Sequence, residues 1–494
     1  MNTHHPAGIL ILGLLLTQLL AAIQVYLSNI DLYSTLSAVK TAGYLTIPNA
    51  TVMKSLREFR PAFLGGLFFT FSIGAGLSLG SMAAAWLWVS VFLRNKLVLY
   101  IFLAAWGGLL LSINIDGFNS IPTLYFLFIP PVLFVLMVKR KSREDIHTSR
   151  IRRWVHVLPI PLLALLWFTQ YDKEMFLDLR DNLLLSNLVG TKFSNFYYTY
   201  TLYPAEAFKS LDQKIIKTCK VKDVPNHSIQ LKLEKRLIAN DYLLLADASQ
   251  VDLSIIQNKG NLVFEADGHR VFEVKQDQFL SDSRRVLQKF SRATDRHATF
   301  RHLTFLSLLI GFPVLIYMLA HAGLYYLFFL FLHPKTAALT ASIMCLLIGT
   351  LVLFYFQAHR SSNIKIANIP ASLISEKWQT RVAALKIIHQ KRLEIATYRA
   401  YPQVLKSRVP QERYWFARSL SVSRRPDTYN DLLFLLKDPN TNVRTMAYYS
   451  LGRRKNPQAI GPILESIETA NDWYTQMYAY NALRSLGWKQ KKLP

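Results

Sequence analysis

The chain has 494 residues, of which 51% are hydrophobic, and it carries a formal net charge of +26. This length exceeds what one hydrophobic core usually organises, so two or three structural units are expected. It contains two cysteines, Cys219 in a polar stretch and Cys345 in an apolar run, and no structural disulfide is expected between such different environments.

The first predicted element is an apolar segment near the start of the chain. Residues 6–30 carry no charge, and residues 9–27 are predicted to span a membrane, because a bilayer core about 30 Å thick needs roughly 20 apolar helical residues. A cleaved signal peptide is the alternative. It is disfavoured because residues 1–6 contain no Lys or Arg and because the apolar run is longer than that of a typical signal peptide.

The next segments join this span to a second one. Residues 31–60 are mixed in character and are predicted to form an amphipathic connector near the headgroups. Residues 61–93 carry no charge and favour one long or kinked helix, since each half would be too short to cross. Gly74, Gly76 and Gly80 mark either a weak point in that helix or a close contact with another helix.

Residues 97–115 and 121–138 are predicted to form a hairpin of two further spans. Seven basic side chains follow within residues 139–153, beside only Glu144 and Asp145. Because cytoplasmic loops are enriched in Lys and Arg, this basic loop is predicted to lie in the cytoplasm.

Three more apolar segments complete the predicted membrane region. Residues 154–171 are the weakest candidate and either cross the membrane or lie in its interface, whereas residues 303–332 and 336–356 form a second hairpin. That hairpin returns the chain to the side it left, so both soluble modules share one face. Hydrophobicity favours a crossing by residues 154–171, which puts both modules outside the cytoplasm, whereas the basic residues just before residue 303 favour the cytoplasm.

The soluble module predicted at residues 172–302 has α+β character. It opens with a helical pattern at residues 175–187, and the aromatic residues from Phe193 to Tyr203 are then typical of a strand or a membrane-interface belt, with a binding platform as the alternative. Five runs with strand character predict a β-meander, at residues 229–233, 242–245, 251–256, 262–265 and 271–274, with hairpin turns at Asn258–Gly260 and Asp267–Gly268.

The last part of this module, residues 276–302, returns to a helical pattern with basic side chains. Arg284, Arg285 and Arg292 are predicted to contact anionic lipid headgroups. Cys219 is the one candidate nucleophile, because the lysines around it would lower the pKa of its thiol. A structural role is favoured, since no base is assigned to it.

The C-terminal module, residues 358–494, repeats at a nearly constant interval. Apolar helices place leucines at separations of 35, 31 and 32 residues, namely Leu385, Leu420, Leu451 and Leu483. Repeats of this length cannot bury a core alone and must stack on their neighbours. An α-solenoid is therefore predicted.

The clearest repeat covers residues 435–464, where Asp438 and Pro439 precede a helical run that reaches Leu451 and Gly452. It resembles the short HEAT-like repeats of the phycobilisome-lyase type, in the C-terminal module only. The resemblance implies that Asp438 and Pro439 start a helix, that Leu451 packs inward and that Gly452 occupies the C′ position after the helix end.

The C-terminal module also carries most of the charge surplus, with 23 Lys and Arg against 9 Asp and Glu in residues 358–494. Such a surplus points to an anionic neighbour, either an acidic protein face or lipid headgroups, and nucleic acid is disfavoured for a membrane-anchored chain. Arg453, Arg454 and Lys455 follow Gly452 in a predicted turn, where they are expected to face solvent and to contact a protein partner or lipid.

The predicted fold is mainly α: a polytopic helical membrane protein with a small α+β soluble module and a C-terminal HEAT-like α-solenoid. This favours a membrane-anchored scaffold or adaptor that binds a protein partner, within a cell-envelope assembly at a bacterial inner membrane. No catalytic residue, cofactor or metal site is assigned. The alternative is a membrane enzyme acting on a lipid-linked substrate through Asp31 or Asp116. A transporter should carry ionisable groups within its spans, and it is disfavoured because only His156 and His321 qualify and both lie near predicted span ends.

Overall fold

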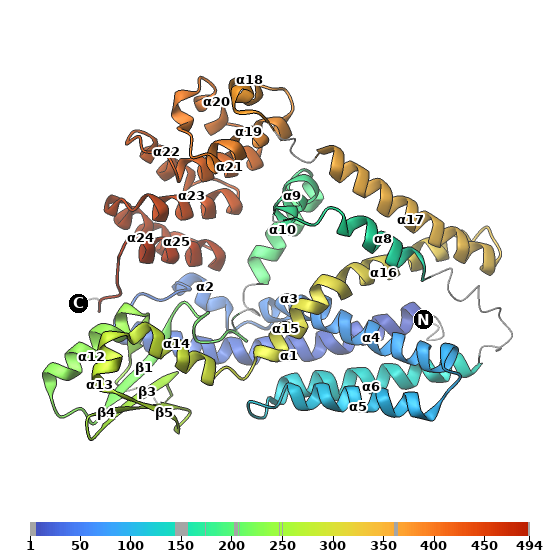
Figure 1. Cartoon of the computed structure of the whole chain (residues 1–494), viewed down its shortest axis with the longest axis horizontal. Helices are drawn as coiled ribbons and strands as arrows, with labels where there is room; N and C mark the ends of the chain where they lie inside the picture. The colour runs from blue at the N-terminus through green and yellow to red at the C-terminus, as the bar shows by residue number, and fades with distance from the viewer. Residues whose placement is uncertain are drawn as a thin grey trace.

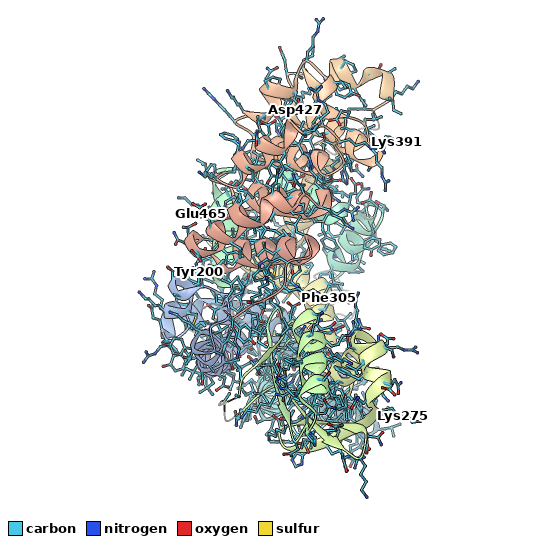
Figure 2. The ribbon with its side chains drawn as sticks, turned by 90° about the vertical axis from the view of Figure 1, so that its left-hand side faces the viewer. Tyr200, Lys275, Phe305, Lys391, Asp427 and Glu465 are labelled. Atoms are coloured by element: carbon cyan, nitrogen blue, oxygen red, sulfur yellow. The ribbon has the colours of Figure 1, made fainter. Side chains whose placement is uncertain are left out.

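The computed structural model describes residues 6–143, 157–172, 174–201, 206, 208–246, 248, 250–359 and 364–492. The described part of the chain is mainly helical and contains a small sheet, as the sequence predicts, but the sheet is mixed and not a simple meander. Long apolar helices run side by side, and the sheet and the C-terminal repeats lie toward one end of them (Figure 1). Lys391 and Asp427 in the repeats lie at the opposite end of the molecule from Lys275 in the sheet module (Figure 2).

The N-terminal region is a set of long apolar helices: α1 (Pro6–Thr41), α2 (Ala50–Ser55), α3 (Phe59–Phe69), η1 (Thr70–Gly74), α4 (Ala75–Trp86), η2 (Leu87–Val91), α5 (Lys96–Ser112) and α6 (Ser120–Arg143). After them come α8 (Pro159–Phe168) and, later in the chain, α15 (Ala298–Leu306), η4 (Ser307–Gly311), α16 (Phe312–Phe329) and α17 (Pro334–His359). Residues 139–143 of the predicted basic loop continue α6 as helix, and residues 144–153 lie outside the described residues.

Among the described residues, five helices are long and apolar enough to cross a membrane: Pro6–Thr41, Phe59–Val91, Ser120–Arg140, Ala298–Phe329 and Pro334–Ala358. Two predicted spans correspond to shorter apolar helices. Residues 97–115 overlap α5, a helix of 17 residues that begins at Lys96, and residues 154–171 contain α8, with 10 residues. The helical part of α8 is about 15 Å long, half the thickness of a bilayer core.

The prediction of one long helix after residue 60 is confirmed, because α3, η1, α4 and η2 continue without a break from Phe59 to Val91. Two of its glycines lie at close helix contacts. A Cβ at Gly74 would collide with Thr17 of α1, and a Cβ at Gly76 would collide with Ser307 of η4. A Cβ at Gly80 would meet nothing within 4 Å.

The predicted connector at residues 31–60 is wrong in its first part, where residues 31–41 continue α1 as regular helix. This stretch contains neither Pro nor Gly, so nothing local stops the helix. Gly43, with φ of 81°, adopts the left-handed conformation just after the helix end. The chain then runs to α2.

Side-chain contacts fix the direction of each apolar helix. α6 runs antiparallel to α1, because Tyr125 donates a hydrogen bond to Gln24 (2.7 Å) and the later residue Leu133 lies beside the earlier residue Gly13. α3 is antiparallel to α1 in the same way, since Gly66 lies beside Ala22 and Gly74 lies beside Thr17.

Similar contacts fix the relative directions of two further pairs of apolar helices. Asn114 at the end of α5 donates to Thr123 of α6 (2.9 Å), which makes an antiparallel hairpin. Residue numbers rise together along α8 and α17, where Leu163 lies beside Gly349 and the rings of Trp167 and Phe356 are 5.7 Å apart, so these two helices are parallel.

The sheet module contains β1 (Lys217–Lys222), β2 (Tyr242–Leu244), β3 (Leu253–Asn258), β4 (Asn261–Ala266) and β5 (His269–Lys275) in the order β2-β1-β3-β4-β5. β1 is parallel to both of its neighbours, whereas β3, β4 and β5 form an antiparallel meander. Its helices are α9 (Met175–Leu179), η3 (Arg180–Leu184), α10 (Leu188–Tyr200), α12 (His227–Ala239), α13 (Gln276–Ser281) and α14 (Ser283–Ala293).

Four of the five predicted β-runs are strands, but residues 229–233 are wrong because they belong to α12. The Asn226 side chain accepts hydrogen bonds from the first backbone N–H groups of this helix, and Leu233 and Leu237, one turn apart, are buried. The aromatic residues from Phe193 to Tyr200 are also helical, as part of α10, rather than a strand.

The C-terminal module consists of short helices: η5 (Ile366–Asn368), α18 (Ile369–Leu373), α19 (Trp378–Gln390), η6 (Ile395–Thr397), α20 (Tyr401–Leu405), α21 (Pro410–Leu420), α22 (Thr428–Leu435), α23 (Thr441–Arg454), η7 (Pro457–Ala459), α24 (Ile460–Thr469) and α25 (Trp473–Ser485). α19, α21, α23 and α25 stack on one another in sequence order. The four leucines that define the period are each no more than 1% exposed, which confirms their predicted place in the core.

Candidate functional site

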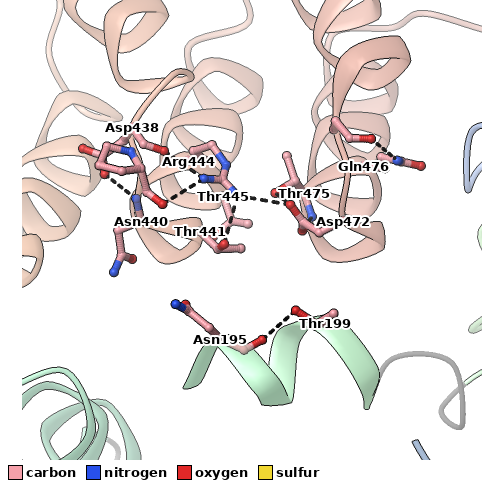
Figure 3. Close-up of polar contacts among 12 residues, drawn as sticks. Asn195, Thr199, Asp438, Asn440, Thr441, Arg444, Thr445, Asp472, Thr475 and Gln476 are labelled. Atoms are coloured by element: carbon pink, nitrogen blue, oxygen red, sulfur yellow. Dashed lines mark hydrogen bonds and ion pairs between the residues drawn. The ribbon is translucent and has the colours of Figure 1, made fainter. Parts of the chain in front are cut away.

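The stacked helices of the C-terminal module are joined by a ladder of arginines near their N-termini. Arg381 pairs with Glu412 (2.6 Å) and Arg413 with Asp438 (2.6 Å). Arg444 continues the ladder to Asp472 (3.1 Å), as Figure 3 shows. Each arginine also donates to backbone carbonyls of the turn before its own helix. The ladder therefore fixes one repeat against the next.

The end of α23 differs from the prediction that Gly452 lies after the helix. Gly452 is buried inside α23, and a Cβ there would lie 3.1 Å from the Cα of Ala482 in α25. Its small size thus serves the close packing of two repeats. The left-handed position after the helix is held by Lys455, with φ of 53°.

One face of the stack is occupied by an acidic segment of the same chain, residues 174–181. The Lys386 ammonium lies 2.6 Å from the carboxylate of Asp178 and 3.2 Å from that of Glu174. The Asp178 and Lys386 side chains are each only 5% exposed. Burial raises the pKa of the Asp178 carboxyl, although Lys386 opposes that shift.

Asp181 makes the second part of this contact, on α21. Trp415 donates its indole N–H to the Asp181 carboxylate (2.9 Å), and Gln411 donates to the Asp181 carbonyl oxygen (2.9 Å). The Arg180 guanidinium lies over the Tyr414 ring, 3.9 Å from its centroid. Such buried polar contacts hold the acidic segment in one orientation.

The aromatic helix α10 extends the contact to the last two repeats. Tyr198 donates a hydrogen bond to Asn442 of α23 (2.7 Å), and its ring lies 4.5 Å from the ring of Tyr474 in α25. Figure 3 shows α10 beneath the N-terminal ends of α23 and α25. We call the surface contacted by residues 174–198 the docking face; it comprises Lys386, Gln411, Trp415, Asn442 and Tyr474.

Two other parts of the chain also hold the repeats. Leu45 exchanges two backbone hydrogen bonds with the Gln490 side chain (3.2 and 2.9 Å). In the sheet module, Asp241 accepts a hydrogen bond from Tyr480 (2.6 Å) and lies 3.0 Å from the Arg484 guanidinium. The repeat module is therefore fixed to both the N-terminal region and the sheet module.

A groove of about 920 Å³ lies at the other ends of the repeat helices. It is lined by residues that end or follow successive helices: Arg392, Glu394, Ser421, Val422, Arg424, Gly452, Arg453, Lys455 and Ser485. All four of its cations are exposed, and among the described residues none of them has an ion-pair partner. We call this surface the basic groove.

Two of the three predicted contact residues in this module line the basic groove. Arg453 and Lys455 are exposed, although Arg453 belongs to the last turn of α23 rather than to a loop. Arg454 does not face solvent as predicted. It is half-buried and donates to the Thr428 hydroxyl (2.7 Å) and to the Arg425 carbonyl (2.7 Å), so it joins two repeats.

The predicted contact residues of the sheet module lie on α14. Arg284, Arg285 and Arg292 share one exposed face of this helix, while Val286 and Phe290 are buried on the other. The structure thus separates the predicted basic residues into two surfaces on two modules.

The remaining candidates for chemistry are isolated. Cys219 lies in β1 and is fully buried, and burial raises the pKa of its thiol, so the neighbouring lysines do not activate it. Asp31 and Asp116 are both exposed. His321 shares a hydrogen bond with Ser342 on the adjacent helix (3.1 Å), and His156 lies outside the described residues. Among the described residues, no group of three His, Cys, Asp or Glu side chains could hold a metal ion.

Comparison with known families assigns part of this architecture. Residues 401–484 match the family of HEAT repeats. The C-terminal module contains HEAT repeats. The match confirms the resemblance drawn from residues 435–464 and extends it over α20 to α25. HEAT repeats generally mediate protein–protein interaction. Comparison with curated proteins and with solved structures gives no significant match for the chain.

Two features of the site escaped the sequence analysis. The arginine ladder carries a usable signal, because Arg381, Arg413 and Arg444 recur at intervals of 32 and 31 residues, close to those of the repeat leucines. The acidic segment carries none, since Asp178 and Lys386 are 208 residues apart in the chain.

Proposed function

We propose that this protein is a membrane-anchored scaffold that presents its HEAT repeats to a protein partner. The observation that carries the proposal is the attachment of the repeats by their docking face, by Leu45 and by Asp241 to the rest of the chain. A repeat module fixed at so many points is a rigid platform, and a preorganised surface loses less entropy when a partner binds.

The alternating helix directions support the membrane assignment. If α1, α3–α4, α5, α6, α8, α15–α16 and α17 each pass from one side to the other, all segments that touch the two soluble modules fall on one side. The Asn119 side chain, for example, donates to the Arg296 carbonyl of the sheet module (2.9 Å), and Leu45 contacts the repeats. The parallel course of α8 and α17 supports a crossing by residues 154–171, of which the ten-residue α8 covers about half the thickness of a bilayer core.

The charge pattern supports an extracytoplasmic location of both modules at a bacterial inner membrane. On this arrangement the seven basic residues within residues 139–153, the first four of which end α6, lie on the side opposite the modules, together with Arg94 and Lys96. Lys and Arg in short loops set orientation, whereas long domains cross the membrane largely regardless of their charge. The surplus in the repeat module therefore does not oppose this orientation.

On the same proposal, the exposed face of α14 contacts anionic headgroups. This helix is followed directly by α15, which begins one of the apolar helices, and Arg292 is nearest to that junction. A basic side chain near an anionic membrane surface contributes about 1 kcal/mol.

Epitope tags inserted at the Lys259–Gly260 turn and after Pro494 test the sidedness. Both are expected to react with antibody added outside intact inner-membrane spheroplasts, and a tag in the 144–153 loop is the opposite-side control. Opposite labelling of the first two tags would refute the proposed arrangement, and labelling of both only after lysis would place the modules in the cytoplasm.

Cross-linking in intact cells tests the scaffold role. A protein partner should be recovered in constant ratio with the wild type and lost with Leu451→Asp, which disrupts the repeat core, while Glu468→Gln, an exposed change, retains it. Recovery of the same protein with Leu451→Asp, or of none with the wild type, would contradict the proposed function.

A further inference from the structure

We propose that the basic groove is a binding site for an acidic segment of a protein partner. This inference rests on the proposed scaffold function and names the chemistry of its partner. The lining of the groove carries a surplus of positive charge. It contains four cations, Arg392, Arg424, Arg453 and Lys455, and one acidic residue, Glu394.

The charge surplus is not neutralised by the groove itself. The Glu394 carboxylate already accepts hydrogen bonds from the Ser423 hydroxyl (2.8 Å) and from the Arg424 backbone N–H (3.0 Å). Carbonyl groups at the helix ends attract cations, but they supply only partial charges. The four cationic side chains thus remain available to carboxylates from outside.

The docking face shows which chemistry this module already binds. There, Lys386 and Trp415 hold two carboxylates of the acidic segment, Asp178 and Asp181, in a buried contact. The same stack therefore offers a second anion-binding surface that the chain leaves open.

Position favours a protein over the lipid surface as the occupant. The N-terminal ends of α23 and α25 contact α10, which packs on α3, one of the apolar helices. Arg453 lies eleven residues after Asn442 on α23, which places it about 17 Å farther from α10 along the helix axis. The groove thus opens on the side away from the apolar helices. Its volume of about 920 Å³ lies within the range of ligand-binding pockets.

The test uses the full-length protein in phosphatidylcholine nanodiscs and a fluorescent ten-residue peptide of alternating Glu and Ser. The groove variant combines Arg392→Gln, Arg424→Gln, Arg453→Gln and Lys455→Gln. The matched control removes four exposed charges elsewhere in the same module: Lys377→Gln, Arg399→Gln, Lys406→Gln and Lys437→Gln. Equal melting temperatures of all three proteins establish that folding is intact.

The peptide is expected to bind the wild type, with an affinity that falls as salt rises, and to bind the groove variant about tenfold or more weakly. The control variant should stay within about twofold of the wild type, and a Lys–Ser peptide should bind none of them. Equal weakening in both variants would overturn the proposal, because binding would then follow net charge alone. Unchanged binding to the groove variant, or no binding to the wild type, would overturn it as well.

Flotation with phosphatidylglycerol vesicles tests the lipid alternative. If the groove variant loses vesicle binding and keeps peptide binding, the groove recognises headgroups and the proposal is wrong. Failure of this proposal is distinct from failure of the scaffold role. A partner that still cross-links to the groove variant supports the scaffold role without the groove. A wild type that cross-links to no partner refutes the scaffold role and leaves the peptide result unaffected.

Discussion

The docking face and the basic groove belong to the same stack of repeats, yet one is filled and the other is open. On the docking face, Lys386 is buried and lies between two carboxylates of the same chain. In the basic groove, the cations Arg392, Arg424, Arg453 and Lys455 are exposed and lack an acidic partner among the described residues. A cationic repeat surface is therefore not by itself a free binding surface. Only the packing of distant segments decides which cations remain available.

Both the docking face and the basic groove require an intact stack of repeats. Leu451→Asp should unfold the repeat module at a cost of several kcal/mol, because Leu451 is 1% exposed and the new carboxylate would be buried without a partner. Limited proteolysis of the full-length protein measures this. Phe434→Asp is the control, since Phe434 is 60% exposed; equal protease resistance of the Leu451 variant and the wild type would contradict the assigned core.

Lys386→Met should release the acidic segment from the docking face. Removing this cation breaks the ion pair of the buried Asp178 carboxylate, which typically costs about 3–5 kcal/mol. Hydrogen exchange of residues 174–198 should rise, while exchange in α24 stays constant. Adding Asp178→Leu should restore much of the protection, since the buried negative charge is then removed as well. If the two variants exchange alike, the ion pair does not hold the segment.

The same contact has a defined pH dependence. The pKa of the Asp178 carboxyl is raised in the docked state, so the docked state binds more protons than the released state. Docking therefore weakens as the pH rises through the pKa of the docked carboxyl. It strengthens as the pH falls toward 3.8. In Lys386→Met the counteracting cation is absent, so acidification should partly restore protection of residues 174–198. The Lys386→Met/Asp178→Leu protein should show no such recovery, and equal recovery in both would exclude Asp178 as the titrating group.

The smallest expected effect separates two adjacent arginines. Arg454→Gln should lower stability by about 1–2 kcal/mol, because its hydrogen bonds to Thr428 and Arg425 would be lost, whereas Arg453→Gln should stay within about 0.5 kcal/mol of the wild type. Peptide binding should weaken more in Arg453→Gln than in Arg454→Gln. Chemical denaturation and peptide titration of both variants check this; a larger loss of stability in the Arg453 variant would reverse the assignment.

Patterns that repeat over short distances could be interpreted from the sequence. The leucine interval identified the stacked repeats, the uncharged run after residue 60 identified one long helix, and the turn at Lys259–Gly260 marked a hairpin. These succeed because helix period, hydrophobic length and turn chemistry are set by neighbouring residues. Residues 229–233 misled because a short apolar run fits a strand and an amphipathic helix equally well.

Local patterns in the sequence therefore account for the repeats, the apolar helices and the surplus of positive charge. The tertiary structure alone decided how those charges are used. Arg454 joins two repeats and Arg453 faces the groove, although they are adjacent in the chain. Lys386 is neutralised by Asp178, which lies 208 residues earlier. The physical reason is that burial and ion pairing depend on groups brought together by folding, and no local pattern encodes that distance.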